Sequence, residues 1–167
     1  MGKLQILIGM IASGKSSYCK NAARQGIICM NDDAIVNMLH GDEYTLYDKD
    51  LKPFYKSIEN HIVASALLMK RTIIVDRGLS ISVKGRKRWI ALAKSFDVPC
   101  EAIVFKNEGP EVHAKRRHSS DARGHDYDYW LKVSSKHFEN YEAPSLLEGL
   151  DSIYQVSFEE IKSGKIF

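Results

Sequence analysis

Residues 9–16 read Gly-Met-Ile-Ala-Ser-Gly-Lys-Ser and directly follow the apolar run Leu4–Ile8. The spacing fits the phosphate-binding pattern G-x-x-x-x-G-K-[ST], in which glycines allow backbone N–H groups to turn toward a phosphate. The pattern requires a strand before the loop and a helix after it, because the positive end of that helix points at the same phosphate. The sequence therefore predicts a P-loop, with Lys15 at the β- and γ-phosphates and the Ser16 hydroxyl on Mg²⁺.

Short apolar runs alternate with longer helical patterns along the rest of the chain. Strands are expected at 4–8, 27–30, 72–75, 100–105 and 152–156, and helices at 15–24, 51–69, 83–96, from 111 and from 130. The longest helix is indicated by apolar residues at spacings of three and four between Leu51 and Met69. This alternation predicts an α/β fold, a P-loop NTPase three-layer αβα arrangement with a four- to five-stranded parallel sheet and a helical lid.

The length of 167 residues is that of one domain, so we expect residues 1–167 to form a single domain. The formal net charge of +3 says little about partners, but the charges are unevenly distributed. Seven basic residues lie between Lys70 and Arg88 with the single acid Asp76, whereas the segment from Asn31 to Asp50 is acidic. This separation suits a cleft that binds polyanions on one side, and it is equally compatible with two solvated faces.

The three cysteines, Cys19, Cys29 and Cys100, form no C-x-x-C pair, so neither a disulfide framework nor a zinc site is indicated. The histidines show no metal-ligand spacing either. The first apolar run is too short for a signal peptide or a membrane span. We therefore expect a cytoplasmic protein that does not enter a membrane.

Acidic side chains follow two more of the expected strands. Asp32 and Asp33 come after the strand at 27–30, and Asp76 follows the strand at 72–75. Ligands of open parallel sheets bind beyond the carboxyl ends of the strands, so these carboxylates should converge on the P-loop. One of the pair can accept the proton of an attacking hydroxyl, and Asp76 can support Mg²⁺. A helix N-cap for Asp32 or Asp33 and a turn for Asp76 remain the structural alternatives.

A polar segment rich in arginine separates the helices expected from 111 and from 130. It contains Arg116, Arg117 and Arg123, followed by Gly124. Arginines that arrive when a site closes stabilise charge on a phosphoryl group in transfer, and a Gly-containing stretch between two helices is typical of a mobile lid. The alternative is a solvated helix end, where basic residues favour the helix dipole.

Taken together, these parts resemble the polynucleotide 5′-kinase family, the P-loop phosphotransferases of nucleic-acid end repair and their phage and bacterial relatives. The likeness covers about residues 3–145. It rests on an ordered set of motifs: the P-loop at 9–16, Asn-Asp-Asp at 31–33, Ile-Ile-Val-Asp at 73–76, Arg-Lys-Arg-Trp at 86–89 with Ala-Lys at 93–94, Arg-Arg at 116–117, Arg-Gly at 123–124 and Phe-Glu-Asn-Tyr-Glu-Ala-Pro at 138–144.

The resemblance implies transfer of the γ-phosphate of ATP to the 5′-hydroxyl end of DNA or RNA. Asp32 would act as general base, with Lys15, Arg117 and Arg123 as the catalytic cations. Mg²⁺ would be held by Ser16 and Asp76. The donor phosphates would be bound by Gly9, Ala12, Ser13, Gly14, Lys15, Ser16, Ser17 and Arg116.

The chain departs from the family pattern at two places. The family commonly has an arginine three residues after its base, where it contacts the phosphate of the acceptor, and this chain has Ile35 there. The acid after the third strand is usually followed by small polar residues, whereas here Arg77-Gly78 follows. Either change leaves open that the acceptor is held differently, or that it is a nucleoside, nucleotide, sugar or antibiotic. A third reading, a nucleotide-dependent switch, lacks the guanine-reading N-K-x-D sequence.

Overall fold

The computed structural model describes residues 2–121 and 124–163. Five strands form one sheet in the order β2-β3-β1-β4-β5, and every pairing is parallel. The strands are β1 (Leu4–Ile8), β2 (Ile28–Asn31), β3 (Ile73–Asp76), β4 (Cys100–Phe105) and β5 (Ser152–Val156). Asp76 of β3 is opposite Leu7 of β1 and Asn31 of β2, so these three strands end at the same edge of the sheet.

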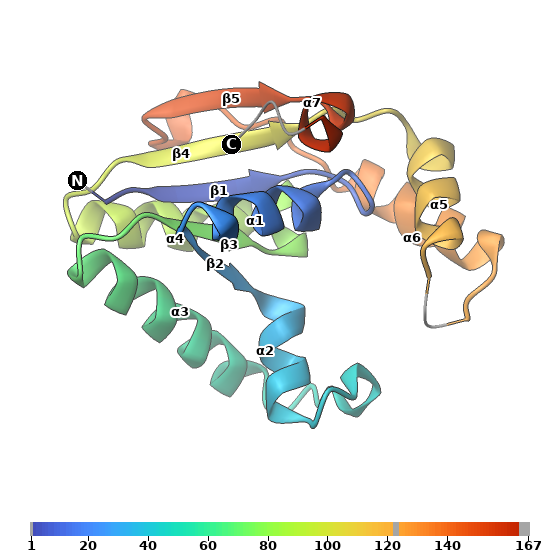
Figure 1. Cartoon of the computed structure of the whole chain (residues 1–167), viewed down its shortest axis with the longest axis horizontal. Coiled ribbons are helices and arrows are strands. Elements are labelled where there is room, and N and C mark those ends of the chain that lie inside the picture. Colours follow the sequence, from blue (N-terminus) through green and yellow to red (C-terminus); the bar gives the residue numbers. More distant parts are fainter. Residues whose placement is uncertain (1, 122–123, 164–167) are drawn as a thin grey trace.

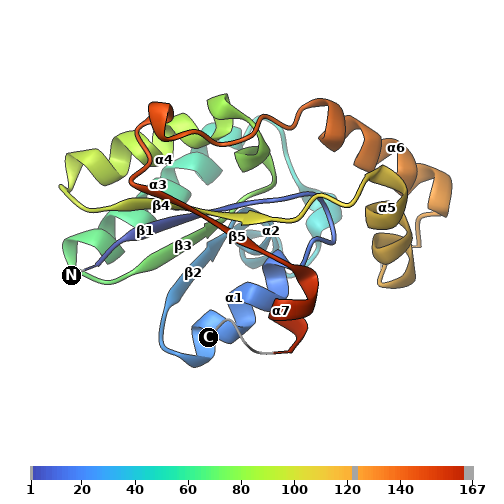
Figure 2. The same cartoon turned by 90° about the horizontal axis from the view of Figure 1, so that it is seen from above.

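Helices cover both faces of this sheet (Figures 1 and 2). On one face, α1 (Lys15–Arg24) and α7 (Phe158–Lys162) pack on a cluster that includes Leu7 and Ile74. On the other, α3 (Lys52–Leu68) and α4 (Val83–Ser95) pack on a cluster that includes Ile6 and Val75. Neighbouring strand residues thus point to opposite faces and both faces are buried, as in parallel sheets generally. The expected three-layer α/β fold is confirmed, with five strands.

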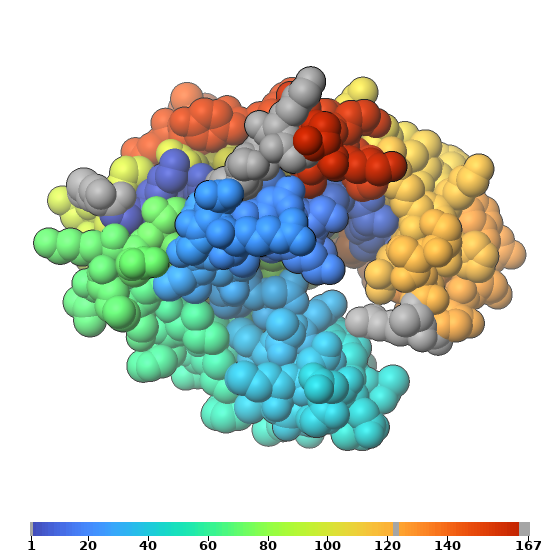
Figure 3. All heavy atoms as spheres, in the orientation of Figure 1, coloured from blue at the N-terminus to red at the C-terminus, as the bar shows by residue number. Residues whose placement is uncertain are grey.

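Helices α5 (Pro110–Ser119) and α6 (Tyr127–Glu139) pack mainly against each other, beyond the carboxyl end of β4 (Figure 1). We call these two helices the lid pair. Helix α2 (Asp32–Leu39) and the short 3₁₀ turn Tyr44–Leu46 lie below the sheet in the view of Figure 1, across from the lid pair. Figure 3 shows an open cleft between the lid pair and these segments, with the loop between β1 and α1 at its inner end.

Helix α4 is docked closely against the 3₁₀ turn Gly78–Ile81, which follows β3. A Cβ atom on Gly85 would overlap the carbonyl oxygen of Leu79. The fully buried guanidinium of Arg86 donates to the carbonyls of Ser80 at 3.1 Å and Glu142 at 3.0 Å, and to both carboxylate oxygens of Glu148 at 2.8 Å. These contacts fix the segment that leads away from β3 and therefore the edge of the sheet where the acids lie.

In the parts of the chain that the structure describes, the helices all lack either the length or the apolar composition needed to cross a bilayer.

Candidate active site

The loop between β1 and α1 is shaped for an anion. Gly14 has a φ of 103° and Ala12 a φ of 49°, both in the left-handed region. A Cβ on Gly9 would lie 2.6 Å from Ser13 Oγ and 2.7 Å from the Cβ of Phe105, so only glycine allows the backbone to pass there. The Oγ atom of Ser13 is buried and has no hydrogen-bond partner among the described residues.

The first turn of α1 leaves its N–H groups available. Its N-cap, Gly14, supplies no side-chain hydrogen bond, and the first turn contains no acidic residue. The first N–H groups of a helix have no partner within the helix, so those at residues 15–17 point at the loop together with the positive end of the helix dipole. This arrangement fits the oxygens of a phosphate chain, and Ser16 and Ser17 lie exposed within it.

The Lys15 ammonium lies over the P-loop and donates to the carbonyl oxygens of Gly9 at 2.9 Å and Met10 at 2.7 Å. Burial lowers the pKa of Lys15, while the carboxylates of Asp76 and Asp32 act in the opposite direction. Both acids therefore lie within electrostatic reach of the P-loop lysine, as the order of the strands predicts.

Asn31 connects the ends of β2 and β3. Its Oδ1 accepts the N–H of Ala34 at 2.8 Å, and its Nδ2 donates to Asp76 Oδ2 at 3.1 Å. Asn31 is thus the N-cap of α2. The alternative that Asp32 or Asp33 is the N-cap is therefore wrong. Strand β2 ends one residue later than the sequence suggested, so both acids lie in the first turn of α2.

Asp76 is buried next to the P-loop. Burial raises the pKa of Asp76, whereas Lys15 and the hydrogen bond from Asn31 lower it. Within the described residues, no group of three His, Cys, Asp or Glu side chains could hold a metal ion by itself. Mg²⁺ bound to nucleotides commonly takes only one or two protein ligands besides phosphate and water oxygens, and Asp76 with Ser16 fits that kind of site.

Asp32 lies between the P-loop and a group of arginines. Its side chain is 25% exposed, its Oδ1 accepts the N–H of Asp33 at 3.2 Å, and its Oδ2 is 3.4 Å from Nε of Arg77. Burial, with the neighbouring Asp33, raises the pKa of Asp32 to about 6, although Arg77 acts to lower it. Such a carboxylate is ionised at neutral pH and is still basic enough to receive a proton.

Glu59 holds two arginines next to Asp32, and the sequence analysis did not identify it. Arg77 Nε is 3.3 Å from Glu59 Oε2, and Arg88 forms an ion pair with the same oxygen. The Arg88 guanidinium also lies over the Trp89 ring, 3.8 Å from its centre. A signal for Glu59 does exist in the sequence, because it occupies the helical face shared by the buried residues Tyr55 and Val63, four positions away on either side.

The position at which the family commonly has an arginine is part of the core. Ile35 is only 5% exposed and belongs to the same apolar cluster as Val63 and Val75. Its side chain is therefore directed away from a ligand in the cleft.

The lid arginines have different surroundings. Arg116 pairs with Glu108, and its guanidinium is 4.4 Å from the centre of the Phe158 ring. That ring adjoins the P-loop, since a Cβ on Gly14 would lie 3.3 Å from it. Arg117 lies over the ring of Trp130 at 4.7 Å and so joins α5 to α6. Arg123 falls outside the residues that the structure describes.

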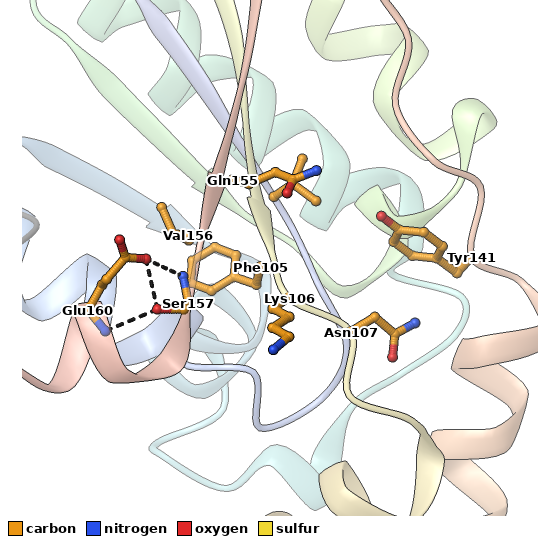
Figure 4. A pocket seen from close by; sticks show the side chains of 9 residues that line it. Phe105, Lys106, Asn107, Tyr141, Gln155, Val156, Ser157 and Glu160 are labelled. Carbon is orange, nitrogen blue, oxygen red and sulfur yellow. Dashed lines mark hydrogen bonds between the residues drawn. The ribbon is translucent and has the colours of Figure 1, made fainter.

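A cavity of about 380 Å³ opens at the carboxyl ends of β4 and β5. Figure 4 shows the side chains of Lys106, Asn107, Gln155 and Tyr141 around it, with Ser157 and Glu160 at the start of α7. Glu160 Oε2 accepts hydrogen bonds from the backbone N–H of Ser157 at 2.8 Å and from its hydroxyl at 2.7 Å. This capping box closes the first turn of α7, which contains Phe158, and the Phe158 ring lies next to the P-loop.

The sheet order, with the P-loop after the central strand, defines a P-loop NTPase fold. The sequence model of the family described as AAA domain matches residues 4–143. The chain belongs to this family. The comparison with curated protein sequences gives no match.

Several solved structures are similar to this one. A protein from Chloroflexus aurantiacus J-10-fl, provisionally described as a kinase, has a TM-score of 0.69 at 16% identity, over 97% of this chain and 91% of that chain. A gluconokinase from Sinorhizobium meliloti 1021 has a TM-score of 0.59 at 20% identity, over 99% and 89% of the two chains. A fungal RNA kinase has a TM-score of 0.65 at 14% identity, over 99% of this chain and 43% of that chain. The protein thus has the fold of P-loop kinases, and that fold is compatible with more than one class of acceptor.

Proposed function

We propose that this protein is an ATP-dependent polynucleotide 5′-hydroxyl kinase, which transfers the γ-phosphate of ATP to the 5′-hydroxyl end of DNA or RNA. The observation that carries the proposal is the position of the Asp32 carboxylate, within electrostatic reach of Lys15 and in contact with Arg77 on its other side. A base in that position can activate a hydroxyl at the end of a triphosphate bound in the P-loop. The ordered family motifs favour a nucleic-acid end as the source of that hydroxyl.

Each step of the transfer has a residue for it. The N–H groups at the start of α1 and the Lys15 ammonium bind the β- and γ-phosphates. Ser16 and Asp76 would hold Mg²⁺, which would neutralise charge on the phosphate oxygens. Asp32 accepts the proton of the 5′-hydroxyl while the hydroxyl oxygen forms a bond to the γ-phosphorus. The bond from that phosphorus to the β-phosphate oxygen breaks, ADP leaves, and Asp32 returns the proton to solvent.

The lid pair supplies the remaining charge in this proposal. Arg116 lies beside the P-loop over Phe158, a position from which its guanidinium can reach the phosphates of a bound nucleotide. Arg117 and Arg123 are proposed to reach the transferring phosphoryl group when the lid closes, and Arg117 would then leave its contact with Trp130.

The test is a transfer assay with γ-labelled ATP, Mg²⁺ and oligonucleotides of DNA and RNA that carry a 5′-hydroxyl. We expect label at the 5′ end, removable by a phosphatase, and none with the Asp32→Asn variant. A 5′-phosphorylated oligonucleotide of the same sequence is the acceptor control. The proposal fails if protein that binds ATP labels no 5′-hydroxyl oligonucleotide.

A small-molecule acceptor is the second candidate, and the burial of Ile35 in the core is the observation that favours it. The arginine that the family resemblance implies for a nucleic-acid phosphate is missing at that position. ADP release with nucleosides, nucleotides, sugars and aminoglycosides as acceptors tests this candidate. Turnover with one of these and none with any oligonucleotide would favour it over the leading proposal.

A further inference from the structure

Two arginines beside Asp32 take no part in the chemistry proposed above. Arg77 is the first residue after β3 and is nine-tenths buried, yet its Nε contacts two carboxylates, Asp32 at 3.4 Å and Glu59 at 3.3 Å. Arg88, on α4, pairs with the same oxygen of Glu59. We call Arg77 and Arg88 the arginine pair.

The protein does not supply regular hydrogen bonds to all the N–H donors of the arginine pair. The Nε atom of Arg88 is buried without a hydrogen-bond partner among the described residues, and that of Arg77 lies 3.3 Å and 3.4 Å from two carboxylates without making a regular hydrogen bond to either. A buried N–H group that makes no hydrogen bond is costly, so an ion-pair network with a purely structural role would be expected to satisfy these atoms. Guanidinium groups whose hydrogen bonds are incomplete, next to a reacting carboxylate, instead point to an anionic ligand.

The charge balance at this place also favours an anion. The arginine pair carries two positive charges, and Glu59 and Asp32 carry two negative ones. When Asp32 takes up the proton of the acceptor, one uncompensated positive charge remains in a largely buried setting. An acceptor phosphate next to the reacting hydroxyl would neutralise that charge during the transfer.

The arginine pair also lies next to the proposed base. Arg77 contacts the carboxylate that receives the proton of the hydroxyl, so a group bound to Arg77 lies close to the reacting oxygen. Ile35 is packed in the core and cannot perform this task. Arg77 and Arg88 are the positively charged side chains that adjoin Asp32 and Glu59 instead.

We propose that the arginine pair binds the phosphate that adjoins the reacting hydroxyl of the acceptor, and that it makes the enzyme select acceptors carrying such a phosphate. Glu59 is the positioning residue that holds the two guanidinium groups in place. The planar fork of an arginine matches two oxygens of one phosphate, which an ammonium group cannot do. This inference rests on the proposed function, because the acceptor must be a nucleic-acid end or another phosphate-bearing alcohol.

A phosphate at this place would also act on Asp32. Arg77 lowers the pKa of Asp32 in the free protein. A phosphate that shares Arg77 weakens this effect and makes Asp32 a stronger base. The inference therefore predicts that the adjoining phosphate improves turnover as well as binding.

The test compares two oligonucleotides with the same sequence and a 5′-hydroxyl. In one, the first internucleotide linkage is the natural phosphodiester, and in the other that linkage alone is a neutral methylphosphonate. With the wild-type protein we expect kcat/KM to fall by about 30-fold on the neutral acceptor, the size expected for one lost charge-assisted contact. A methylphosphonate at the fourth linkage should change kcat/KM less than threefold, which controls for the modification itself.

Variants of the arginine pair then identify the binding groups. Arg77→Met and Arg88→Gln should each use the natural acceptor poorly and show a ratio between natural and neutral acceptors near one. Glu59→Gln should raise KM for the natural acceptor while KM for ATP stays within about twofold. Arg71→Gln, which removes an exposed positive charge at the far end of β3, should keep the wild-type ratio.

The outcomes separate the inference from the proposed function. If wild-type protein phosphorylates both oligonucleotides equally well, or if both arginine variants keep the wild-type ratio, the inference is wrong and the kinase assignment stands. If wild-type protein phosphorylates neither oligonucleotide, the proposed function fails, and the inference falls with it. Arg77→Lys keeps the positive charge but cannot bind two oxygens of one phosphate. If Arg77→Met does not fold, the ratio between natural and neutral acceptors is measured with Arg77→Lys instead.

Discussion

Asp32 is the single side chain on which the chemistry depends, and its surroundings predict how activity changes with pH. Burial raises its pKa to about 6, and only the ionised form can accept a proton. We therefore expect kcat/KM for the acceptor to fall about tenfold per pH unit below pH 6 and to level off above it. Initial rates between pH 5 and pH 8.5 measure this. An acid limb with its midpoint near pH 4 would show that the free enzyme does not use Asp32 as its base.

The same residue should limit the stability of the protein. The pKa of Asp32 is raised in the folded state from 3.8 to about 6, so the ionised form is disfavoured by folding. Stability from this group is complete below the unfolded pKa and is lost as pH rises through about 6. Asp32→Asn removes the charge and should stabilise the protein at pH 8 by on the order of 1–2 kcal/mol.

Thermal unfolding at two pH values tests this expectation. For a chain of this size the gain corresponds to an increase in Tm of roughly 2–6 °C at pH 8, which should largely vanish near pH 4. The Asp128→Asn variant is the matched control, because Asp128 also lies in the first turn of a helix, α6, but is exposed. A variant that is less stable than wild type at pH 8 would contradict the effect of burial on Asp32.

The helices and strands were predicted from sequence to different degrees. The bounds expected for β1, α1, β4 and β5 match the structure, because the P-loop glycines and the flanking turn residues mark the ends of these elements. Strand β2 starts one residue later than expected, since the N–H of Ile27 donates a hydrogen bond to the carbonyl of Ala22 in the last turn of α1. Helix α7 was not predicted at all. Five residues carry no helical period, and this helix depends on its packing against the P-loop.

The candidate site divides in the same way. Sheet geometry alone brings Lys15, Asp32 and Asp76 together, so their proximity was predictable. The cluster of Arg77, Glu59 and Arg88 joins the end of β3 to side chains of α3 and α4. Its formation depends on how two helices pack on one face of the sheet, which the period of each helix does not specify.

The contact between α4 and the turn after β3 predicts a large effect from one methyl group. A Cβ on Gly85 would overlap the Leu79 carbonyl oxygen, which belongs to backbone and cannot rotate away. Gly85→Ala should therefore force α4 from the turn and destabilise the protein by about 3 kcal/mol or more, measured by urea unfolding. Gly78→Ala is the control, because no atom lies within 4 Å of a Cβ there, and we expect a change within about 0.5 kcal/mol. Equal losses in the two variants would contradict this close contact.

The arrangement of the entire chain separates a rigid part from a part that can move. The sheet and its helices share two apolar clusters, whereas the lid pair packs mainly on itself and stands off the sheet (Figures 1 and 2). The cleft in Figure 3 separates the lid pair from α2, so the two sides of the proposed active site belong to different parts of the molecule. Transfer between them requires that this cleft exclude water, which predicts closure when nucleotide binds.

Hydrogen–deuterium exchange tests the closure of the lid pair. A non-transferable ATP analogue with Mg²⁺ should slow exchange in α5 by on the order of tenfold, because contacts from Arg116 to the phosphates hold that helix against the P-loop. Amides of α3 are the internal control, since this helix packs on the far face of the sheet and should change little. Adenosine, which has the base without the phosphates, should leave α5 unprotected. Equal protection by adenosine, or uniform slowing across the chain, would mean that the ligand stabilises the fold without closing the lid.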